Sequence, residues 1–542
     1  MAKKPTLEEL NNYSREELIT MILMMQGQLD TLNDNIERLI EQVRIANSNR
    51  FGKKSEKLSV IDGQMSFFDE AEMYCDLSVA EPEADEIVRV KRKKKKGQRD
   101  IDLKDFPEEI LPAYSVSIEE LNSFYGEGNW RRMPDETYKR LRHEPESWTV
   151  EVHTVEVYVG TGGEHQDEFK RGNRPKDLLR NSIVTPSLLA SIINVKYVNS
   201  SALNRVEQEF ERNGVNISRQ TMANWIIKCS EKYFVPFVER MEQELLSLPV
   251  NQSDETPTLV IEDSEHPNTK CYMWVHRSGE FNKERQIAIY KYHKGRDHHI
   301  PLEFYKDYKG FLVTDALQQY HIVEKKLEEV VNANCWAHAR RAFADVVKVA
   351  KKTDAKSVQQ SVAYQALQLI GAFYNADTEL KSLSSEERLK ERQRAIKPQV
   401  DAFFAWVKEQ VAECTVSPNS KTGKGLAYVL NQEKYLKVFL TDGDIPIDNS
   451  ASERAIRTFC LGKKNWLFHN SVRGADSSAL VYSISETAKM NNLRPYYYFK
   501  YILTELPKHC DEDGIIDPGK LDYLMPWSEN LPEECMKPKR HS

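Results

Sequence analysis

Three carboxylates in this 542-residue sequence stand where such side chains can do chemistry. Asp254 lies in the run SDETP beside an expected strand, Asp315 directly follows the apolar run FLVT, and Glu453 lies on an expected helix. A carboxylate at the end of an apolar strand is costly to bury alone, so it usually contacts a metal ion or a cation. Together the three could hold Mg²⁺ ions around a scissile phosphate, where one ion activates the attacking oxygen and another stabilises the leaving oxygen. The alternative is that both aspartates cap turns at strand ends.

The helix that would carry Glu453 covers the run DNSASERAIRTFCLG, which starts at residue 448. Asn449 or Ser450 is expected to cap it, because both side chains accept hydrogen bonds from free helix amides. Glu453 and Arg457 are four residues apart, which sets a guanidinium beside the carboxylate on one helix face. The helix is expected to end near Gly462. The alternative is an amphipathic helix with an ordinary surface ion pair.

The basic and aromatic run KKNWLF follows this helix. Lys463 and Lys464 suit contacts to a phosphate backbone, and Trp466 suits stacking on an unpaired base. These three residues are therefore candidate DNA contacts.

A helix-turn-helix is expected at about residues 201–233, with its turn at the Asn-Gly pair that precedes VNISRQTMANW. Ser218 would cap the second helix, while Met222, Trp225 and Ile226 would pack inward. The exposed side of that helix would then carry three residues that can contact DNA: Arg219, Gln220 and Asn224. A plain helical hairpin is the alternative, because such residues are common on any exposed helix face.

Short apolar or alternating runs separated by turn signals predict a sheet between about residues 250 and 320. The expected strands are 258–261, 271–275, 287–292 and 310–314. The alternating run WTVEVHTVEVYVG, from residue 148, predicts a further strand in a smaller domain. From 334 to about 444 the pattern is helical and charge-rich, which indicates an insertion between Asp315 and Glu453.

An N-terminal heptad seam predicts a dimerising helix. Its members recur at alternating spacings of four and three residues: Leu18, Ile22, Met25, Leu29, Leu32, Ile36, Leu39 and Val43. Mostly β-branched residues at one seam position and mostly leucine at the other favour a parallel two-stranded coiled coil. An amphipathic helix packed on its own domain is the alternative.

The composition, 40% hydrophobic and 29% charged, is that of a soluble globular protein, and no apolar run is long enough to cross a membrane. The eight cysteines include no C-x-x-C pair, which argues against a disulfide framework and fits a reducing cytoplasm. Cys335 and His338 form a C-x-x-H pair, for which a packed helix start is favoured over a zinc site. The net charge of −7 hides the basic run RVKRKKKKGQR, a solvated tail or a non-specific DNA anchor.

Taken in order, runs along nearly the whole chain resemble the DDE transposases of the insertion-sequence-66 type. The matching runs are RFGKKSEKL, GQMSFFDEAE, ISRQTMANW, SDETP, KGFLVTDALQQY, NCWAHARRAF, IDNSASERAIR and GKKNWLF followed by RGAD. The resemblance implies an RNase-H-like catalytic core interrupted by a helical insertion. It also implies that Asp254, Asp315 and Glu453 form an acidic triad that binds Mg²⁺, with Mn²⁺ as an alternative ion.

By the same resemblance, His338 and Asp448 are expected to support the metal ligands, and Arg457 and Lys464 to contact DNA. The implied partners are double-stranded DNA at terminal inverted repeats and at the target, a second copy or more of the chain, and accessory proteins encoded alongside. The expected location is the bacterial cytoplasm, at the nucleoid and without a membrane. One departure concerns a small zinc-binding domain with paired cysteines that family members carry. This chain has no cysteine there, so no structural zinc is expected.

The chain is therefore expected to be a multidomain α+β protein. Its expected divisions are a coiled coil (1–48), a basic and acidic linker (49–99), a small β-containing domain derived from a zinc-binding one (100–184), a helix-turn-helix region (185–248), the first part of an RNase-H-like core (249–334), the helical insertion (335–444), the last core helices with a C-terminal domain (445–506), and a tail (507–542).

Two functions are compatible with these features. The first is an enzyme that binds terminal inverted repeats and catalyses Mg²⁺-dependent DNA cleavage and strand transfer. The second is a non-catalytic relic that binds DNA as a dimeric, repressor-like protein. The sequence favours the enzyme because all three carboxylates are present.

Overall fold

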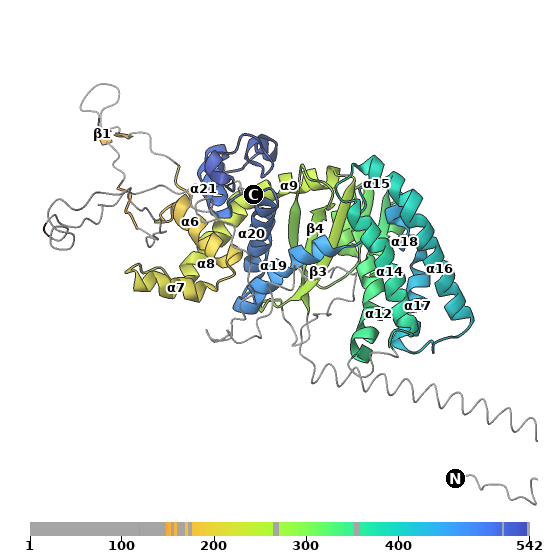
Figure 1. Cartoon of the computed structure of the whole chain (residues 1–542). Coiled ribbons are helices and arrows are strands. Elements are labelled where there is room, and N and C mark those ends of the chain that lie inside the picture. The colour runs from red at the N-terminus through yellow and green to blue at the C-terminus, as the bar shows by residue number, and fades with distance from the viewer. Residues whose placement is uncertain are drawn as a thin grey trace, which may run out of the picture. The chain divides into compact units, whose positions relative to one another are not determined.

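The computed structural model describes residues 119, 148–152, 157–159, 169–171, 176–263, 270–351, 358–511 and 514–538 (Figure 1). The chain divides into two compact units, Met1–Asp76 with Lys176–Lys537, and Leu77–Pro175 with Pro538–Ser542. The expected coiled coil at 1–48 and the linker at 49–99 lie outside the described residues.

In the smaller unit, strands β1 (Val157–Val159) and β2 (Phe169–Arg171) pair antiparallel. Of the described residues in the alternating run from residue 148, only Val157–Val159 form a strand. Val150 and Val152 are not in a strand, and they are 86% and 85% exposed. Alternation is not sufficient for a strand, because the backbone also needs a partner for its hydrogen bonds.

From Lys176 onward, the described part of the larger unit first contains the helices α6 (Pro186–Ile193), η1 (Asn194–Val198), α7 (Leu203–Arg212), α8 (Arg219–Cys229), η2 (Ser230–Phe234) and α9 (Val235–Ser247). Helices α7 and α8 are joined by a turn where one was expected, an arrangement that fits both a helix-turn-helix and a plain helical hairpin. Gly214 turns the chain with a φ of 77°, and the Ser218 side chain accepts a hydrogen bond from the Thr221 amide. Met222, Trp225 and Ile226 are buried as expected.

A mixed five-stranded sheet forms the centre of the larger unit, with the order β5-β4-β3-β6-β7. Its strands are β3 (Val250–Thr258), β4 (Cys271–Ser278), β5 (Ala288–Lys294), β6 (Gly310–Thr314) and β7 (Val330–Asn334). β4 is antiparallel to both β3 and β5, whereas β3, β6 and β7 are parallel. β7 was not expected from the sequence, because asparagine occupies two of the last three positions of its run VVNAN.

The first strand lies earlier in the chain than predicted. β3 covers Val250–Thr258, so Asp254 is inside the strand and not in front of it. Of the expected strand 258–261, Thr258 ends β3, and the following residues instead pair with a segment far along the chain, where Val260 bridges His469. The polar run NQSDET shows no hydrophobic pattern, although this strand is largely buried. Each of Asn251, Gln252, Ser253 and Glu255 makes at least one hydrogen bond, whereas Asn251 Oδ1 and Gln252 Oε1 have no hydrogen-bond partner among the described residues.

The sheet is covered on both faces. Met273 and Val275 of β4 belong to the core formed with α19 (Ser450–Trp466) and α20 (Val472–Met490). Trp274, on the opposite face of β4, belongs to a core with residues of or next to α10 (His299–Phe304) and α11 (Gln318–Lys326). Directly paired residues share a face, so Asp254, opposite Val275, faces α19, whereas Glu255, opposite Trp274, faces α11.

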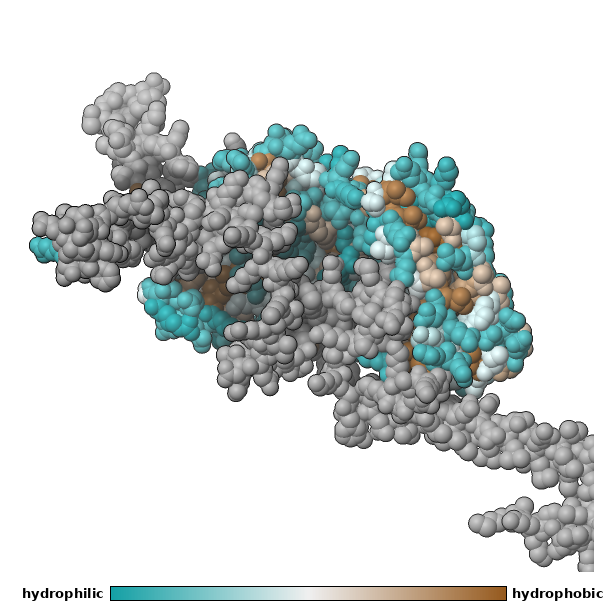
Figure 2. Space-filling model, viewed as in Figure 1, coloured by the Kyte–Doolittle hydropathy of each residue, from teal (hydrophilic) through white to brown (hydrophobic). Residues whose placement is uncertain are grey.

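The insertion is helical, as expected. Its elements are α12 (Trp336–Lys351), α14 (Val362–Glu379), α15 (Ser385–Glu391), η3 (Arg392–Ile396), α16 (Lys397–Ala412), α17 (Lys421–Asn431), α18 (Glu433–Leu436) and η4 (Val438–Leu440). These helices gather beside the sheet (Figure 1), and on the face shown in Figure 2 they carry hydrophobic residues interspersed with hydrophilic ones. Trp336 packs on Phe373, Phe403 and Phe404 inside the insertion.

Two expectations about the C-terminal part need correction. α19 continues past Gly462 to Trp466. Glycine does not end the helix here. It allows close packing against Tyr482 of α20, with which a side chain at this position would collide. The segment after α21 (Pro495–Glu505), expected to be a tail, is packed: Leu521, Leu524 and Cys535 are fully buried. Within the described residues, no helix has the length and apolar character needed to cross a membrane.

Candidate active site

Asp254 is held on a strand whose neighbour carries Asp315. β3 and β6 run parallel, with Gln252 paired to Val313. Asp254 lies two residues after Gln252, and Asp315 lies two residues after Val313, so the two aspartates are at equivalent positions. Asp254 Oδ1 accepts the Glu255 amide (2.9 Å), and Asp315 Oδ1 accepts the Leu317 amide (3.3 Å) at the start of α11. One oxygen of each carboxylate is thus fixed by the backbone. The register brings both carboxylates to the same place in the sheet.

Glu453 lies in the first turn of α19, and three polar contacts fix that helix start. The Ser450 amide donates to Asp448 Oδ1 (2.9 Å), so the buried Asp448 carboxylate performs the capping role expected of Asn449 or Ser450. Asn449 occupies the cap position, but its side chain points to β3 instead. The side-chain amide of Asn449 donates to the Ser253 carbonyl (2.7 Å), and the Gln252 side chain donates to Asn449 Oδ1 (3.2 Å). The helix start is therefore tied to β3 one residue from Asp254.

The charges of the three carboxylates interact. Burial raises the pKa of Asp254 well above its ordinary value, and the nearby charges of Glu255, Asp315 and Glu453 raise it further. Burial, with the Glu255 and Glu453 charges, raises the pKa of Asp315 to about 7, although the Leu317 amide and Arg296 oppose this. Within the described part of the chain, neither aspartate forms an ion pair with lysine or arginine. Such a cluster repels itself unless a cation or protons neutralise it.

The basic side chains near Glu453 are not the one expected. His338 Nδ1 lies 3.8 Å and Arg341 Nη2 lies 3.6 Å from Glu453 Oε1, and both come from α12. Arg457, four residues after Glu453, forms no ion pair with it in the described structure, because tertiary neighbours are closer than the next helical turn. Burial and the Arg341 charge lower the pKa of His338 to about 4. His338 therefore lies beside the acidic cluster, as the C-x-x-H motif led us to expect.

A buried ion pair under the aspartates was missed in the sequence. The fully buried Glu255 carboxylate pairs with the Arg296 guanidinium and accepts hydrogen bonds from Arg296 Nε (2.6 Å) and the Tyr320 hydroxyl (2.7 Å). It occupies the sheet face opposite Asp254. The only sequence signal was the adjacent acidic pair in SDETP, since two neighbouring strand residues must face opposite sides.

The other predicted site residues lie outside the acidic cluster. On α8 the side chains of Arg219, Gln220 and Asn224 are exposed, as a DNA-contacting face requires. At the end of α19, Lys464 is exposed and Lys463 donates to the Pro257 carbonyl (2.5 Å).

Trp466 is only partly accessible. Its ring packs on Phe459 and His469 at centroid distances of 5.6 and 4.4 Å. The neighbouring Phe468 is 45% exposed, so the more open aromatic ring of this segment is that of Phe468.

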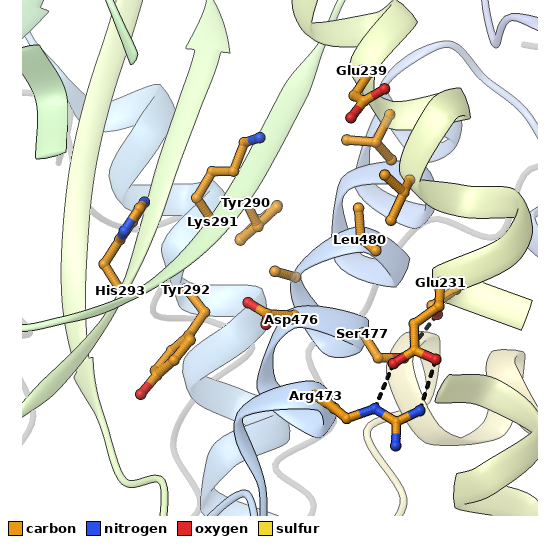
Figure 3. A pocket seen from close by; sticks show the side chains of 14 residues that line it. Glu231, Glu239, Tyr290, Lys291, Tyr292, His293, Arg473, Asp476, Ser477 and Leu480 are labelled. Atoms are coloured by element: carbon orange, nitrogen blue, oxygen red, sulfur yellow. Dashed lines mark hydrogen bonds and ion pairs between the residues drawn. The ribbon is translucent and has the colours of Figure 1, made fainter. Parts of the chain in front are cut away.

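A cavity of about 400 Å³ lies apart from the carboxylates, between η2, α9, β5 and α20 (Figure 3). Glu231 and Arg473 face each other across its mouth in a two-bond ion pair of 2.5 and 2.7 Å. Its lining includes none of Asp254, Asp315 and Glu453. The carboxylate cluster, with its perturbed pKa values and its convergence of three elements, is therefore the stronger candidate for chemistry.

Comparison with known proteins places the chain in a family. Residues 181–477, more than half of the chain, match the model described as "Transposase IS66 family". Residues 38–110 match the model described as "Transposase C of IS166 homeodomain", and residues 483–527 match the "IS66 C-terminal element". The chain belongs to the IS66 family of transposases, and this membership implies DNA as a partner.

Relatives of similar length occur in Sinorhizobium fredii (strain NBRC 101917 / NGR234). The chain is 27% identical to the uncharacterized protein y4hP over 353 residues, which are 64% of this chain and 62% of that protein. It is 25% identical to the uncharacterized protein y4qI over 520 residues (92% and 89%), and 23% identical to the uncharacterized protein y4jD over 524 residues (95% and 96%). Similarity to the latter two extends over nearly the whole length.

Proposed function

We propose that this protein is a metal-dependent transposase that cleaves the ends of a mobile DNA element and transfers its strands, with Asp254, Asp315 and Glu453 as the catalytic carboxylates. The observation that carries the proposal is the interaction of these three charges at one place, where the aspartates have no ion-pair partner among the described residues. Family membership supports the reaction class.

The topology supports an RNase-H-like core. The strand order β5-β4-β3-β6-β7 has one antiparallel strand, β4, between two strands of the opposite direction, followed by the parallel strands β6 and β7. The carboxylates come from the central strand, from the end of its parallel neighbour and from a later helix. Residues 335–444 then insert between the second and third carboxylate.

The donor set fits a hard divalent cation such as Mg²⁺ or Mn²⁺. Asp254, Asp315 and Glu453 would hold it through oxygen atoms, and Glu453 Oε1 is buried without a hydrogen-bond partner. When bound, such ions activate an attacking oxygen and stabilise a leaving oxygen in phosphodiester chemistry.

The chain's own residues fix the carboxylates. Backbone amides hold one oxygen of each aspartate, and Asn449 ties the start of α19 to β3. Asp448 supports the same helix start through the Ser450 amide. The exposed α8 residues Arg219, Gln220 and Asn224, together with Arg457, Lys463, Lys464 and Trp466, are proposed DNA contacts. The segment 1–48 is proposed to dimerise.

The test is cleavage and joining of a labelled duplex that carries the element's terminal repeat, with Mg²⁺ or with chelator. Wild type is expected to cut only with metal and to yield joined products. Asp315→Asn is expected to bind the duplex with unchanged affinity and to cut at least about 1,000-fold more slowly, since the group acts on the transition state. Metal-independent cutting, or full activity in the variant, would refute the carboxylate assignment. Binding without any cutting by wild type would favour the non-catalytic relic.

A further inference from the structure

A second group of donor atoms adjoins the carboxylate cluster. The ligand atoms of Cys335, His338 and Glu453 all lie within 4.8 Å of one another. Cys335 directly precedes α12, His338 lies in its first turn, and Glu453 lies in the first turn of α19. Two helix starts from distant parts of the sequence thus bring three metal-ligating side chains together.

Two of these atoms make no hydrogen bond within the described part of the chain. They are His338 Nδ1 and Glu453 Oε1, which are buried and 3.8 Å apart. Buried polar atoms without partners are costly, so such a pair needs an explanation. Cys335 is fully buried, and its Sγ accepts the Asn449 amide (3.1 Å), which orients the sulfur.

The donor set is chemically distinct from that of the aspartates. A thiolate, an imidazole and a carboxylate select a zinc-class ion, whereas Mg²⁺ takes oxygen ligands. Three protein ligands in a tetrahedral site leave the fourth position for water. The atoms need to approach by only about 1 Å to reach ligand spacings of a zinc site.

We infer that Cys335, His338 and Glu453 form a binding site for a zinc-class divalent ion. The Cys335 thiol releases its proton to solvent when the ion binds. Arg341, 3.6 Å from Glu453 Oε1, competes for the same oxygen, and its half-exposed side chain can turn into water. If the proposed function is correct, an ion here takes Glu453 away from the Mg²⁺ ligands and restrains the enzyme.

The test is a titration of the metal-free full-length chain with Co²⁺ in the absence of DNA. Wild type is expected to develop the thiolate-to-cobalt charge-transfer band and the intense visible bands of a tetrahedral ion, and Zn²⁺ is expected to displace both. Cys335→Ser should remove the charge-transfer band, since the band requires a thiolate. The serine hydroxyl can keep the contact with the Asn449 backbone amide, so the fold should be preserved. His338→Ala should weaken Co²⁺ binding at least about 10-fold. Arg341→Gln should tighten it.

The controls are Cys414→Ser, which removes an exposed thiol, and His299→Ala, which alters another group of potential ligands. Neither should change the charge-transfer band. Absence of the band in wild type, its loss in Cys414→Ser, or unchanged affinity in His338→Ala would overturn the inference. His338→Ala decides the matter if Cys335→Ser does not fold. Because the signal requires no DNA cleavage, it is independent of the proposed catalytic activity.

Discussion

At the scale of single residues, the acidic cluster makes the metal-free protein depend on pH in a defined way. The pKa of Asp315 is raised to about 7 in the folded chain, against about 3.9 in an unfolded one. The folded state therefore keeps a proton that the unfolded chain has lost between these pH values. Folding stability should fall as the pH rises through this window.

Asp315→Asn should remove the contribution of Asp315 to this pH dependence, because asparagine is neutral throughout. In chelator at pH 8 the variant is expected to unfold at a higher temperature than wild type, and the difference should shrink towards pH 5. Thermal unfolding across this pH range measures it, with the exposed Asp307 changed to Asn as the control. A variant less stable than wild type at pH 8 would contradict the raised pKa.

The buried Glu255 makes a second prediction about a single residue. Arg296→Met should leave the carboxylate under Asp254 without its cation and lower the free energy of unfolding by about 2–3 kcal/mol, less than for a fully buried pair because Arg296 is partly exposed. Adding Glu255→Gln should recover part of the loss. Lys306→Met breaks the exposed pair with Glu303 and should lower the free energy of unfolding far less. Chemical denaturation distinguishes these outcomes, and equal losses for both pairs would contradict the argument.

At the scale of elements, the outer edge of β5 is covered by side chains of α20. The Ser483 hydroxyl accepts the Tyr290 amide (2.7 Å), and the Thr487 hydroxyl accepts the Ala288 amide (3.0 Å). These contacts satisfy backbone groups that an edge strand would otherwise leave unpaired. They also fix α20, and with it the face on which α19 lies, against the sheet.

Ser483→Ala should therefore leave the buried Tyr290 amide without a partner and lower the free energy of unfolding by about 1–3 kcal/mol. Ser485→Ala is a matched control on the same helix, because its buried hydroxyl bonds only the Tyr482 carbonyl (3.3 Å). Its cost should be well below that of Ser483→Ala. Denaturation curves of the two variants provide the measurement, and similar losses would rule out the covering role.

The elements also show what the sequence could reveal. β4, β5 and β6 were predictable because apolar runs mark them. The position of β3 was predicted wrongly because its polar residues make hydrogen bonds to residues as distant in sequence as Asn449, and local periodicity does not reveal such bonds. The end of α19 was misplaced because Gly462 signals a helix end locally but here allows contact with Tyr482.

At the scale of the whole molecule, the order of motifs led to the proposed carboxylates, but it did not reveal their neighbours. Asp254, Asp315 and Glu453 each stand in a recognisable run, so the sequence was enough to propose them. The cation near Glu453 is Arg341 of α12 instead of Arg457, and Glu255 is paired with Arg296. Such pairings depend on tertiary folding across the insertion, and the coiled coil proposed at 1–48 lies outside the described residues.

The two surfaces that we propose to contact DNA should differ in what they contribute to binding. Changing Arg219, Gln220 and Asn224 of α8 together to alanine should reduce the preference for a terminal repeat over a scrambled duplex on the order of 100-fold, since each base contact contributes about 1–3 kcal/mol. Lys464→Ala should weaken binding to both duplexes alike and reduce the slope of log affinity against log salt by about 1, because a phosphate contact releases counterions without reading sequence. Equilibrium binding to both duplexes over a range of salt concentrations separates the two effects.

Lys390→Ala, an exposed lysine of the insertion, is the control and should change neither quantity. If the α8 variant instead loses affinity equally for both duplexes, α8 contacts the DNA phosphate backbone and other residues recognise the base sequence. If neither surface affects binding, the exposed residues of α8 belong to a plain helical hairpin. Asp315→Asn should bind like wild type in the same assay, because we propose that this residue, just after β6, acts in the chemistry and not in DNA binding.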